Sequence, residues 1–133
     1  MKGFRFRKLN KAYATLDAAA CDAIYGDNFQ KNGSAVENIG NNVTMEFRAM
    51  DFGPDGTESL SVCWRSGLPK NAMQIVLTGG KDTKRVMIEL DKAENYREKT
   101  FPLGLRVHGM QTVSLVFLPG CSLDLKTIRF LPV

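Results

Sequence analysis

The chain has 133 residues, of which 44% are hydrophobic and 24% are charged, a composition typical of one globular domain. Much of its net charge of +4 comes from basic residues among the first eleven: Lys2, Arg5, Arg7, Lys8 and Lys11. Basic and acidic residues nearly balance elsewhere, so we expect no nucleic-acid partner. No apolar run reaches membrane-spanning length, so we also expect no membrane partner.

Residues 1–10 alternate weakly but carry many charges, and we interpret them as a linker or an edge segment. Residues 11–133 are expected to form a single domain. No apolar stretch follows the basic start, so no export signal is expected within the chain. The sequence fits equally a piece of a larger cytoplasmic protein and a piece of a larger exported one.

The first half of the domain predicts mostly extended chain. We expect Tyr13 to Ile24 to be extended, although its alanines favour helix, and residues 25–34 to form a long loop. Val43 to Phe52 alternates cleanly between apolar and polar residues and predicts a strand. The alternation slips at Ala49 and Met50, which indicates a bulge.

The second half continues in short strands. We expect strands at residues 60–65, 73–77, 86–90 and 103–107, with a hairpin at Gly79-Gly80 and a polar loop at 91–100 carrying Tyr96. About eight strands without an amphipathic helix predict an antiparallel β-sandwich.

Two apolar runs close the chain, separated by Pro119-Gly120. Residues 113–118 predict a strand that is buried on both faces, and residues 123–130 predict a second core strand. Asp124 lies inside that second strand. A carboxylate at such a place needs a cation or several hydrogen-bond donors from elsewhere in the chain.

Catalytic chemistry is poorly represented. A triad needs a histidine between nucleophile and acid, and the only histidine, His108, stands beside a turn glycine. Three distant cysteines, Cys21, Cys63 and Cys121, exclude a complete disulfide framework, and we expect them to be small buried hydrophobes. We therefore expect that the domain itself is not an enzyme.

Saccharide binding is better represented. A sugar ring stacks on an exposed aromatic, while its hydroxyls pair with amides and carboxylates. Tyr25, Phe29 and Tyr96 fall in expected loops that are rich in asparagine, although loop aromatics more often cover a core. Trp64 alternates with Leu60 and Val62, so we expect it in the core.

Three segments, VENIGNNVTMEF (36–47), ENYREKTFPLGLRVHGMQTVSLVF (94–117) and PGCSLDLKTIRF (119–130), resemble in order the family 6 carbohydrate-binding modules and their galactose-binding-like jelly-roll relatives. More closely, DAIYGDNF (22–29), IGNNVTMEFRAMDFG (39–53) and VSLVFLPGCSLDLKTIRF (113–130) resemble the module at the C-terminal end of bacterial family 2 glycoside hydrolases, the β-galactosidases. The resemblance implies a galactose-binding-like jelly roll without catalytic residues.

The resemblance also implies site residues. Tyr96 stands where the family has a loop tryptophan, Glu37 and Asn38 stand near its opposing aromatic, and Ser122 stands where an asparagine pairs with the ligand. A structural Ca²⁺ is implied between Asp17 and Asp124. Ala19 replaces a second acid of the family, so a hydrogen-bonded Asp124 without metal is the alternative.

Two functions follow from the resemblance. The first is a non-catalytic module of a β-galactosidase-like hydrolase, with an oligosaccharide and the catalytic domains of the parent enzyme as partners, binding saccharide weakly because only one stacking aromatic is left. The second is a structural accessory domain that packs on the parent enzyme and has no ligand of its own. A stand-alone hydrolase is a distant third.

Overall fold

The computed structural model describes residues 11–133, so the predicted segment 1–10 lies outside the described residues. Across residues 11–133 the regular elements are one short 3-10 helix, Ala18–Ala20, and strands. The predicted extended segment Tyr13 to Ile24 is therefore confirmed only in part, because its three consecutive alanines form the 3-10 helix. The strands are β1 (Leu16–Asp17), β2 (Ala23–Tyr25), β3 (Gln30–Asn32), β4 (Ala35–Ile39), β5 (Val43–Asp51), β6 (Thr57–Gly79), β7 (Asp82–Val107), β8 (Met110–Phe117) and β9 (Leu123–Pro132).

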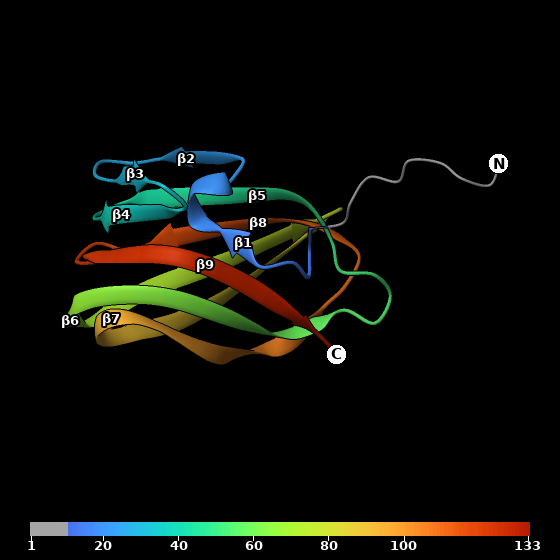
Figure 1. The fold of residues 1–133 in the computed structure, drawn as a ribbon. Coiled ribbons are helices and arrows are strands. Elements are labelled where there is room, and N and C mark those ends of the chain that lie inside the picture. Colours follow the sequence, from blue (N-terminus) through green and yellow to red (C-terminus); the bar gives the residue numbers. More distant parts are fainter. Residues whose placement is uncertain (1–10) are drawn as a thin grey trace, which may run out of the picture.

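The two longest strands, β6 and β7, run through both layers of an antiparallel sandwich and bend at the left of Figure 1. The first half of β6 pairs with β9, whereas its second half pairs with β8. One layer therefore has the order β2-β5-β8-β6-β7, and the other has the order β7-β6-β9-β4-β3, with β1 also on β9. This is the predicted jelly-roll sandwich.

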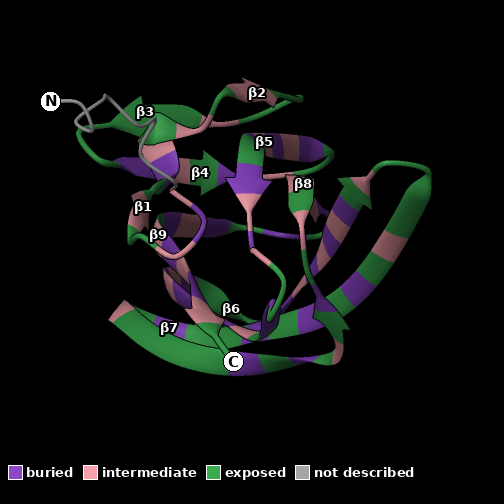
Figure 2. Cartoon of the chain, turned by 90° about the vertical axis from the view of Figure 1, so that its right-hand side faces the viewer, coloured by how far each residue is buried: buried purple, intermediate pink, exposed green. Residues whose placement is uncertain are grey.

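Buried residues alternate with more exposed ones along the strands, as the banding in Figure 2 shows. Trp64 is fully buried between the layers, as predicted, and its indole nitrogen donates a 2.8 Å hydrogen bond to the carbonyl oxygen of Asp91. Tilted packing on Phe101 completes its surroundings. The core thus occupies the space between the layers and leaves both outer faces and both ends for function.

The prediction of a loop at residues 91–100 is wrong, because these residues continue β7. Arg97 pairs with Trp64 and Lys99 with Val62, so the backbone groups of this polar stretch are satisfied by β6. The stretch was misread because an edge strand carries charged side chains that discourage pairing with other chains. Tyr96 therefore lies on a strand and not on a loop.

Other departures are local. The predicted loop 25–34 contains β3, and β8 alternates between buried and half-buried residues and so is not buried on both faces. Cys21 and Cys63 are half-buried, whereas Cys121 is buried, so the prediction for the cysteines holds for one of the three. The predicted bulge in β5 is confirmed by a register shift between Phe47 and Met50.

Candidate functional site

The loops at the bent end of β6 and β7 enclose two adjoining hollows, of about 560 and about 250 Å³, which share Asn38 and Ser122. Together we call them the loop-end cleft. Its lining residues are Asp27, Asn28, Asn38, Ile39, Gly40, Asn41, Arg65, Ser66, Gly67, Cys121, Ser122, Leu123 and Asp124. The cleft therefore combines the loop before β3, the β4–β5 turn, the bend of β6 and the β8–β9 turn.

Backbone contacts fix the asparagines of the cleft. Asn28 donates from its amide to the carbonyl oxygen of Asn38 at 3.0 Å, and its own carbonyl oxygen accepts from the Gly40 N–H at 3.0 Å. Asn41 accepts at its side-chain oxygen from the Gly120 N–H at 2.8 Å, which ties the β4–β5 turn to the β8–β9 turn. The amides are thus held in place before any ligand arrives.

A buried asparagine supports the opposite wall. The side-chain oxygen of Asn71 accepts from the Ser122 N–H at 2.9 Å, and its amide donates to the Ser66 hydroxyl at 2.9 Å. Ser66 donates onward to the Ser122 carbonyl oxygen at 2.6 Å, which closes the ring of hydrogen bonds. Because Asn71 is almost fully buried, this ring holds Ser122 rigidly.

Several residues that line the cleft have side-chain atoms without a hydrogen-bond partner in the described part of the chain. Counting only partners within residues 11–133, the Asn41 amide nitrogen, the Ser122 hydroxyl and the second terminal nitrogen of Arg65 have no acceptor. The side-chain oxygens of Asn28 and Asn38 have no donor in the same part of the chain. The cleft thus offers donors and acceptors side by side.

Two predicted site residues line the cleft and two do not. Asn38 and Ser122 line both hollows, whereas Tyr96 and Glu37 line neither and instead contact Arg65. Glu37 lies with one carboxylate oxygen 3.6 Å from Nη2 of Arg65. No aromatic residue of the described chain, residues 11–133, lines the cleft.

The surroundings of Tyr96 are occupied by cations. The Arg65 guanidinium lies 4.5 Å and the Lys126 ammonium 5.4 Å from the centre of its ring. Its hydroxyl is buried without a hydrogen-bond partner among residues 11–133, and this burial raises the pKa of the Tyr96 phenol. Little of the ring is therefore open to a sugar.

Asp124 finds its partners within the protein. Nε and Nη2 of Arg65 donate to Oδ2 of Asp124 at 2.9 and 2.7 Å, and the Asn38 N–H donates to Oδ1 at 2.9 Å. The hydrogen bonds to Asp124 raise the pKa of Arg65 above its usual value. Both oxygens of this carboxylate are therefore in use.

The two residues implied as calcium ligands are not brought together. Asp17 pairs with Thr127, which is three residues further along β9 than Asp124. At the rise of a β-strand, three residues place the Cα atoms of Thr127 and Asp124 about 10 Å apart, whereas Ca²⁺ needs six to eight oxygens at about 2.3–2.6 Å. No group of three or more acidic, cysteine or histidine side chains suited to a metal occurs within residues 11–133. The residues present do not fit an ion shared by Asp17 and Asp124.

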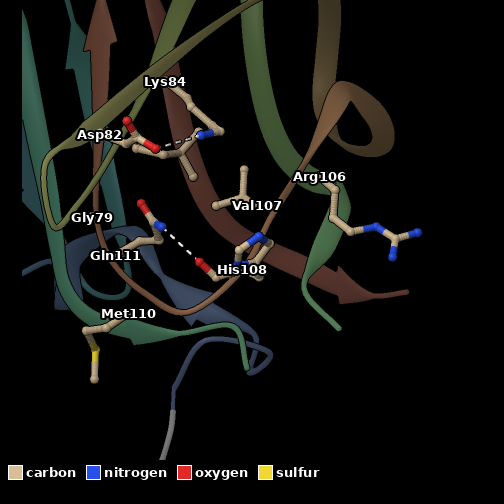
Figure 3. Close-up of a pocket in the computed structure, with 9 residues that line it drawn as sticks. Gly79, Asp82, Lys84, Arg106, Val107, His108, Met110 and Gln111 are labelled. Carbon is tan, nitrogen blue, oxygen red and sulfur yellow. Dashed lines mark hydrogen bonds and ion pairs between the residues drawn. The ribbon is translucent and has the colours of Figure 1, made fainter. Parts of the chain in front are cut away.

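A third hollow, of about 200 Å³, lies at the other end of the sandwich and is drawn in Figure 3. We call it the hairpin-end pocket; it is lined by Leu77, Gly79, Asp82, Lys84, Arg106, Val107, His108, Met110 and Gln111. Asp82 faces Lys84 at 3.6 Å, and the Gln111 amide donates to the His108 carbonyl oxygen at 2.9 Å. The Arg106 side chain points away from the pocket and pairs with Glu58.

Sequence reasoning missed Asn28, Asn41, Arg65 and Ser66 as lining residues. The signal for the two asparagines was present, because both lie in asparagine-rich segments with turn chemistry. Arg65 gave no signal of this kind, since a strand arginine near a distant aspartate is visible only once β6 and β9 are paired. No helix within residues 11–133 is long and apolar enough to cross a membrane.

Comparison with known proteins gives a fold. No protein-family model and no curated protein sequence matches the chain. Among solved structures it is similar to CsCBM6-3 from Clostridium stercorarium in complex with cellobiose, with a TM-score of 0.75 and 20% identity over 92% of this chain and 95% of that one.

Two further solved structures widen the comparison. A family 6 carbohydrate-binding module from Clostridium cellulolyticum in complex with xylose has a TM-score of 0.75 and 19% identity over 90% of this chain and 98% of that one. A family 43 arabinoxylan arabinofuranohydrolase from Bacillus subtilis has a TM-score of 0.64 and 18% identity over 91% of this chain but only 24% of its own. This chain therefore has the fold of the family 6 carbohydrate-binding modules.

Proposed function

We propose that the chain is a non-catalytic carbohydrate-binding module that holds a neutral saccharide in the loop-end cleft. The observation that carries this proposal is the set of unused donors and acceptors on Asn28, Asn38, Asn41 and Ser122, held by backbone hydrogen bonds. A sugar hydroxyl donates and accepts at once, so it fits a wall that offers both. The fold shared with modules solved with cellobiose and with xylose supports the same function.

The charges around the cleft favour a neutral ligand over an acidic one. Arg65 is matched by two carboxylates, Asp124 at 2.7 Å and Glu37 at 3.6 Å, so its positive charge is already compensated. Asp27 adds a further carboxylate to the lining. An anionic sugar would meet this negative balance and be repelled.

Binding is expected to be weak. The lining of the cleft is mainly polar and lacks an aromatic platform within residues 11–133, so hydrogen bonds exchanged with water supply most of the affinity. Such a site belongs in the millimolar range, which corresponds to about 4 kcal/mol. Tyr96 is expected to contribute through Arg65 and not by stacking on the sugar.

We also propose that the module belongs to a larger glycoside hydrolase of the β-galactosidase type, family 2, and that its catalytic domains are partners. The likeness of segments 22–29, 39–53 and 113–130 to the C-terminal module of those enzymes supports this proposal. The comparison with the longer arabinofuranohydrolase chain shows that the same fold occurs inside a larger hydrolase.

Isothermal titration with neutral oligosaccharides built on glucose, xylose and galactose tests the proposal. Asn41→Asp keeps the acceptor for the Gly120 N–H, replaces the two amide donors with a second acceptor oxygen and adds a negative charge, so it should weaken binding about tenfold without unfolding the protein. His108→Ala in the hairpin-end pocket is the matched control and should leave the affinity unchanged. Equal affinity in wild type and Asn41→Asp would remove the loop-end cleft as the site.

One observation favours the accessory function as second candidate. In register across the outer face of the β2-β5-β8-β6-β7 layer lie Tyr25, Thr44, Val116, Gln74 and Met87, a row without charge. Tyr25 and Met87 are 52% and 49% exposed. Such a face suits packing against another domain of the parent protein. A flat titration across all saccharides, together with a stable complex between this chain and the catalytic domains, would favour this candidate.

A further inference from the structure

The Arg65–Asp124 pair joins three neighbouring strands at the wall of the loop-end cleft. Arg65 lies on β6, Asp124 on β9, and the Asn38 N–H that Asp124 accepts belongs to β4. The arginine places two nitrogens on one carboxylate oxygen, at 2.9 and 2.7 Å. Charge-assisted bonds of this kind are the stronger and more directional hydrogen bonds in proteins.

Asn38 is the residue in this group whose backbone needs support. Its φ is +56°, in the left-handed region that non-glycine residues rarely adopt, and the pairing of β4 with β9 shifts register around it. Its N–H therefore has no regular place in the ladder and donates to Oδ1 of Asp124 at 2.9 Å. The carboxylate thus fixes the backbone from which the Asn38 side chain reaches the cleft.

This arrangement differs from the calcium tie that the resemblance implies. There, a metal ion would compensate the charge of Asp124 and join it to Asp17. Here, Asp17 is exposed and lies opposite Thr127, and the positive charge beside Asp124 is the Arg65 guanidinium. A guanidinium at 2.7 Å and a divalent cation compete for the same carboxylate oxygen.

We propose that Arg65 replaces the metal ion in this chain, and that Arg65 and Asp124 are positioning residues that hold Asn38 in the saccharide cleft. The part that concerns the saccharide rests on the proposed function. The module should accordingly need no Ca²⁺ either to fold or to form its cleft. The position of Asn38 then depends on a forked donor, which lysine cannot supply.

The first arm of the test uses the unmodified protein. Its melting temperature is measured in CaCl2 and after dialysis against EDTA, and the two values should differ by less than about 1 °C, since a ligand of the native state would raise it. A clear rise with Ca²⁺ that disappears in Asp124→Asn would overturn the proposal, because the ion would then occupy the place assigned to Arg65.

The second arm asks whether the pair positions Asn38. Arg65→Lys keeps the charge but removes the fork, and Asp124→Asn keeps the shape but removes the charge. Each should shift the Asn38 amide resonance and weaken saccharide binding about tenfold, while circular dichroism stays native. The matched control is Arg106→Lys, whose partner Glu58 lies 3.1 Å away at the other end of the sandwich, and which should change neither readout.

The outcomes separate this inference from the proposed function. If no saccharide binds the wild type, the proposed function fails, and the Asn38 resonance and the calcium response still decide the role of Arg65. An Asn38 amide that is unmoved in both folded variants would refute the positioning role. An Asn38 shift with unchanged saccharide affinity would refute the link between the pair and the cleft.

Discussion

The two ends of the sandwich each carry a hollow, but they hold their polar groups in different ways. At the loop end, the Gly120 N–H donates to the Asn41 side chain and the Ser122 N–H donates to the Asn71 side chain, while the Asn41 amide and the Ser122 hydroxyl have no acceptor among residues 11–133. At the hairpin end, Lys84 faces Asp82 at 3.6 Å, and Asp82 is 84% exposed. Anchoring together with unused capacity is the preorganisation that the proposed saccharide site requires.

The difference arises from what each end must connect. The loop end gathers four separate segments whose backbone groups cannot all enter a strand ladder, so side-chain amides satisfy them. The hairpin end is closed by the short β6–β7 connection and by β8, whose backbone groups pair mainly in strands, and within residues 11–133 a single side-chain amide of its lining, that of Gln111, donates to a backbone carbonyl oxygen. The predictions below test this contrast, from the largest expected effect to the smallest.

Asn71→Ala should have the largest effect, because it removes the buried support of the loop-end cleft. The Leu90 carbonyl oxygen would lose a side-chain partner in a buried place and the Ser122 N–H would lose its partner in a partly buried one, and we expect about 3 kcal/mol lower unfolding free energy. Urea denaturation measures the loss, and saccharide affinity should fall with it. A loss below about 1 kcal/mol would show that the ring of hydrogen bonds around Asn71 is not structural.

Gly79→Ala should destabilise the hairpin end without touching saccharide binding. A Cβ at this position would come within 2.7 Å of the Met110 carbonyl oxygen and 2.5 Å of the Gln111 amide nitrogen. We expect about 2 kcal/mol lower unfolding free energy from this overlap. Titration of the folded variant should return wild-type affinity. Reduced affinity would mean that the two ends are coupled or that the ligand binds at the hairpin end.

Gly40→Ala, at the loop end, should instead weaken saccharide binding and leave the stability nearly unchanged. The added Cβ would lie 3.3 Å from Cβ of Asn28, a tight contact that Asn28 can relieve by moving. Unfolding free energy should change by less than about 1 kcal/mol, whereas saccharide affinity should fall about three- to tenfold. Calorimetric titration and thermal denaturation on one preparation give both values. Unchanged affinity would argue against a role for Asn28.

Asp22 lines neither the loop-end cleft nor the hairpin-end pocket, so it provides a baseline for variants at both ends. Acid should slightly lower the unfolding free energy through this residue. Burial alone would raise the pKa of Asp22, but hydrogen bonds from the Arg48 N–H and the Lys11 ammonium outweigh it and lower the pKa below 3.8. A lowered carboxyl pKa stabilises the native state above the unfolded pKa, and this contribution is lost as the pH falls through the folded pKa.

Asp22→Asn should therefore lower the unfolding free energy by about 1 kcal/mol at pH 6, and the difference from wild type should shrink below about pH 4. Denaturation curves at both pH values measure it. A difference that persists unchanged at pH 2.5 would contradict the assignment. Saccharide affinity at pH 6 should be equal in the two proteins, because Asp22 lies outside the cleft.

The sequence predicted most of the scaffold and only part of the site. The alternation of apolar and polar residues predicted β5 with its bulge, the buried Trp64 and the two closing strands. A strand that is buried on one face shows this alternation with a period of two residues. The strand carrying Tyr96 was missed, because an edge strand looks like a polar loop when its pairing with β6 is unknown. Asn38 and Ser122, two of the residues predicted to bind saccharide, line the cleft, whereas the place of Arg65 depends on contacts between distant strands.

The most direct test of the central claim is a titration of the isotopically labelled protein with neutral oligosaccharides, followed through backbone and side-chain amide resonances. We predict shifts at the side-chain amides of Asn28, Asn38 and Asn41 and at the Ser122 backbone amide, with Gln111 at the hairpin end unmoved. Shifts centred on Gln111 or on the outer-face row from Tyr25 to Met87, without shifts at the three asparagines of the cleft, would contradict saccharide binding in the loop-end cleft.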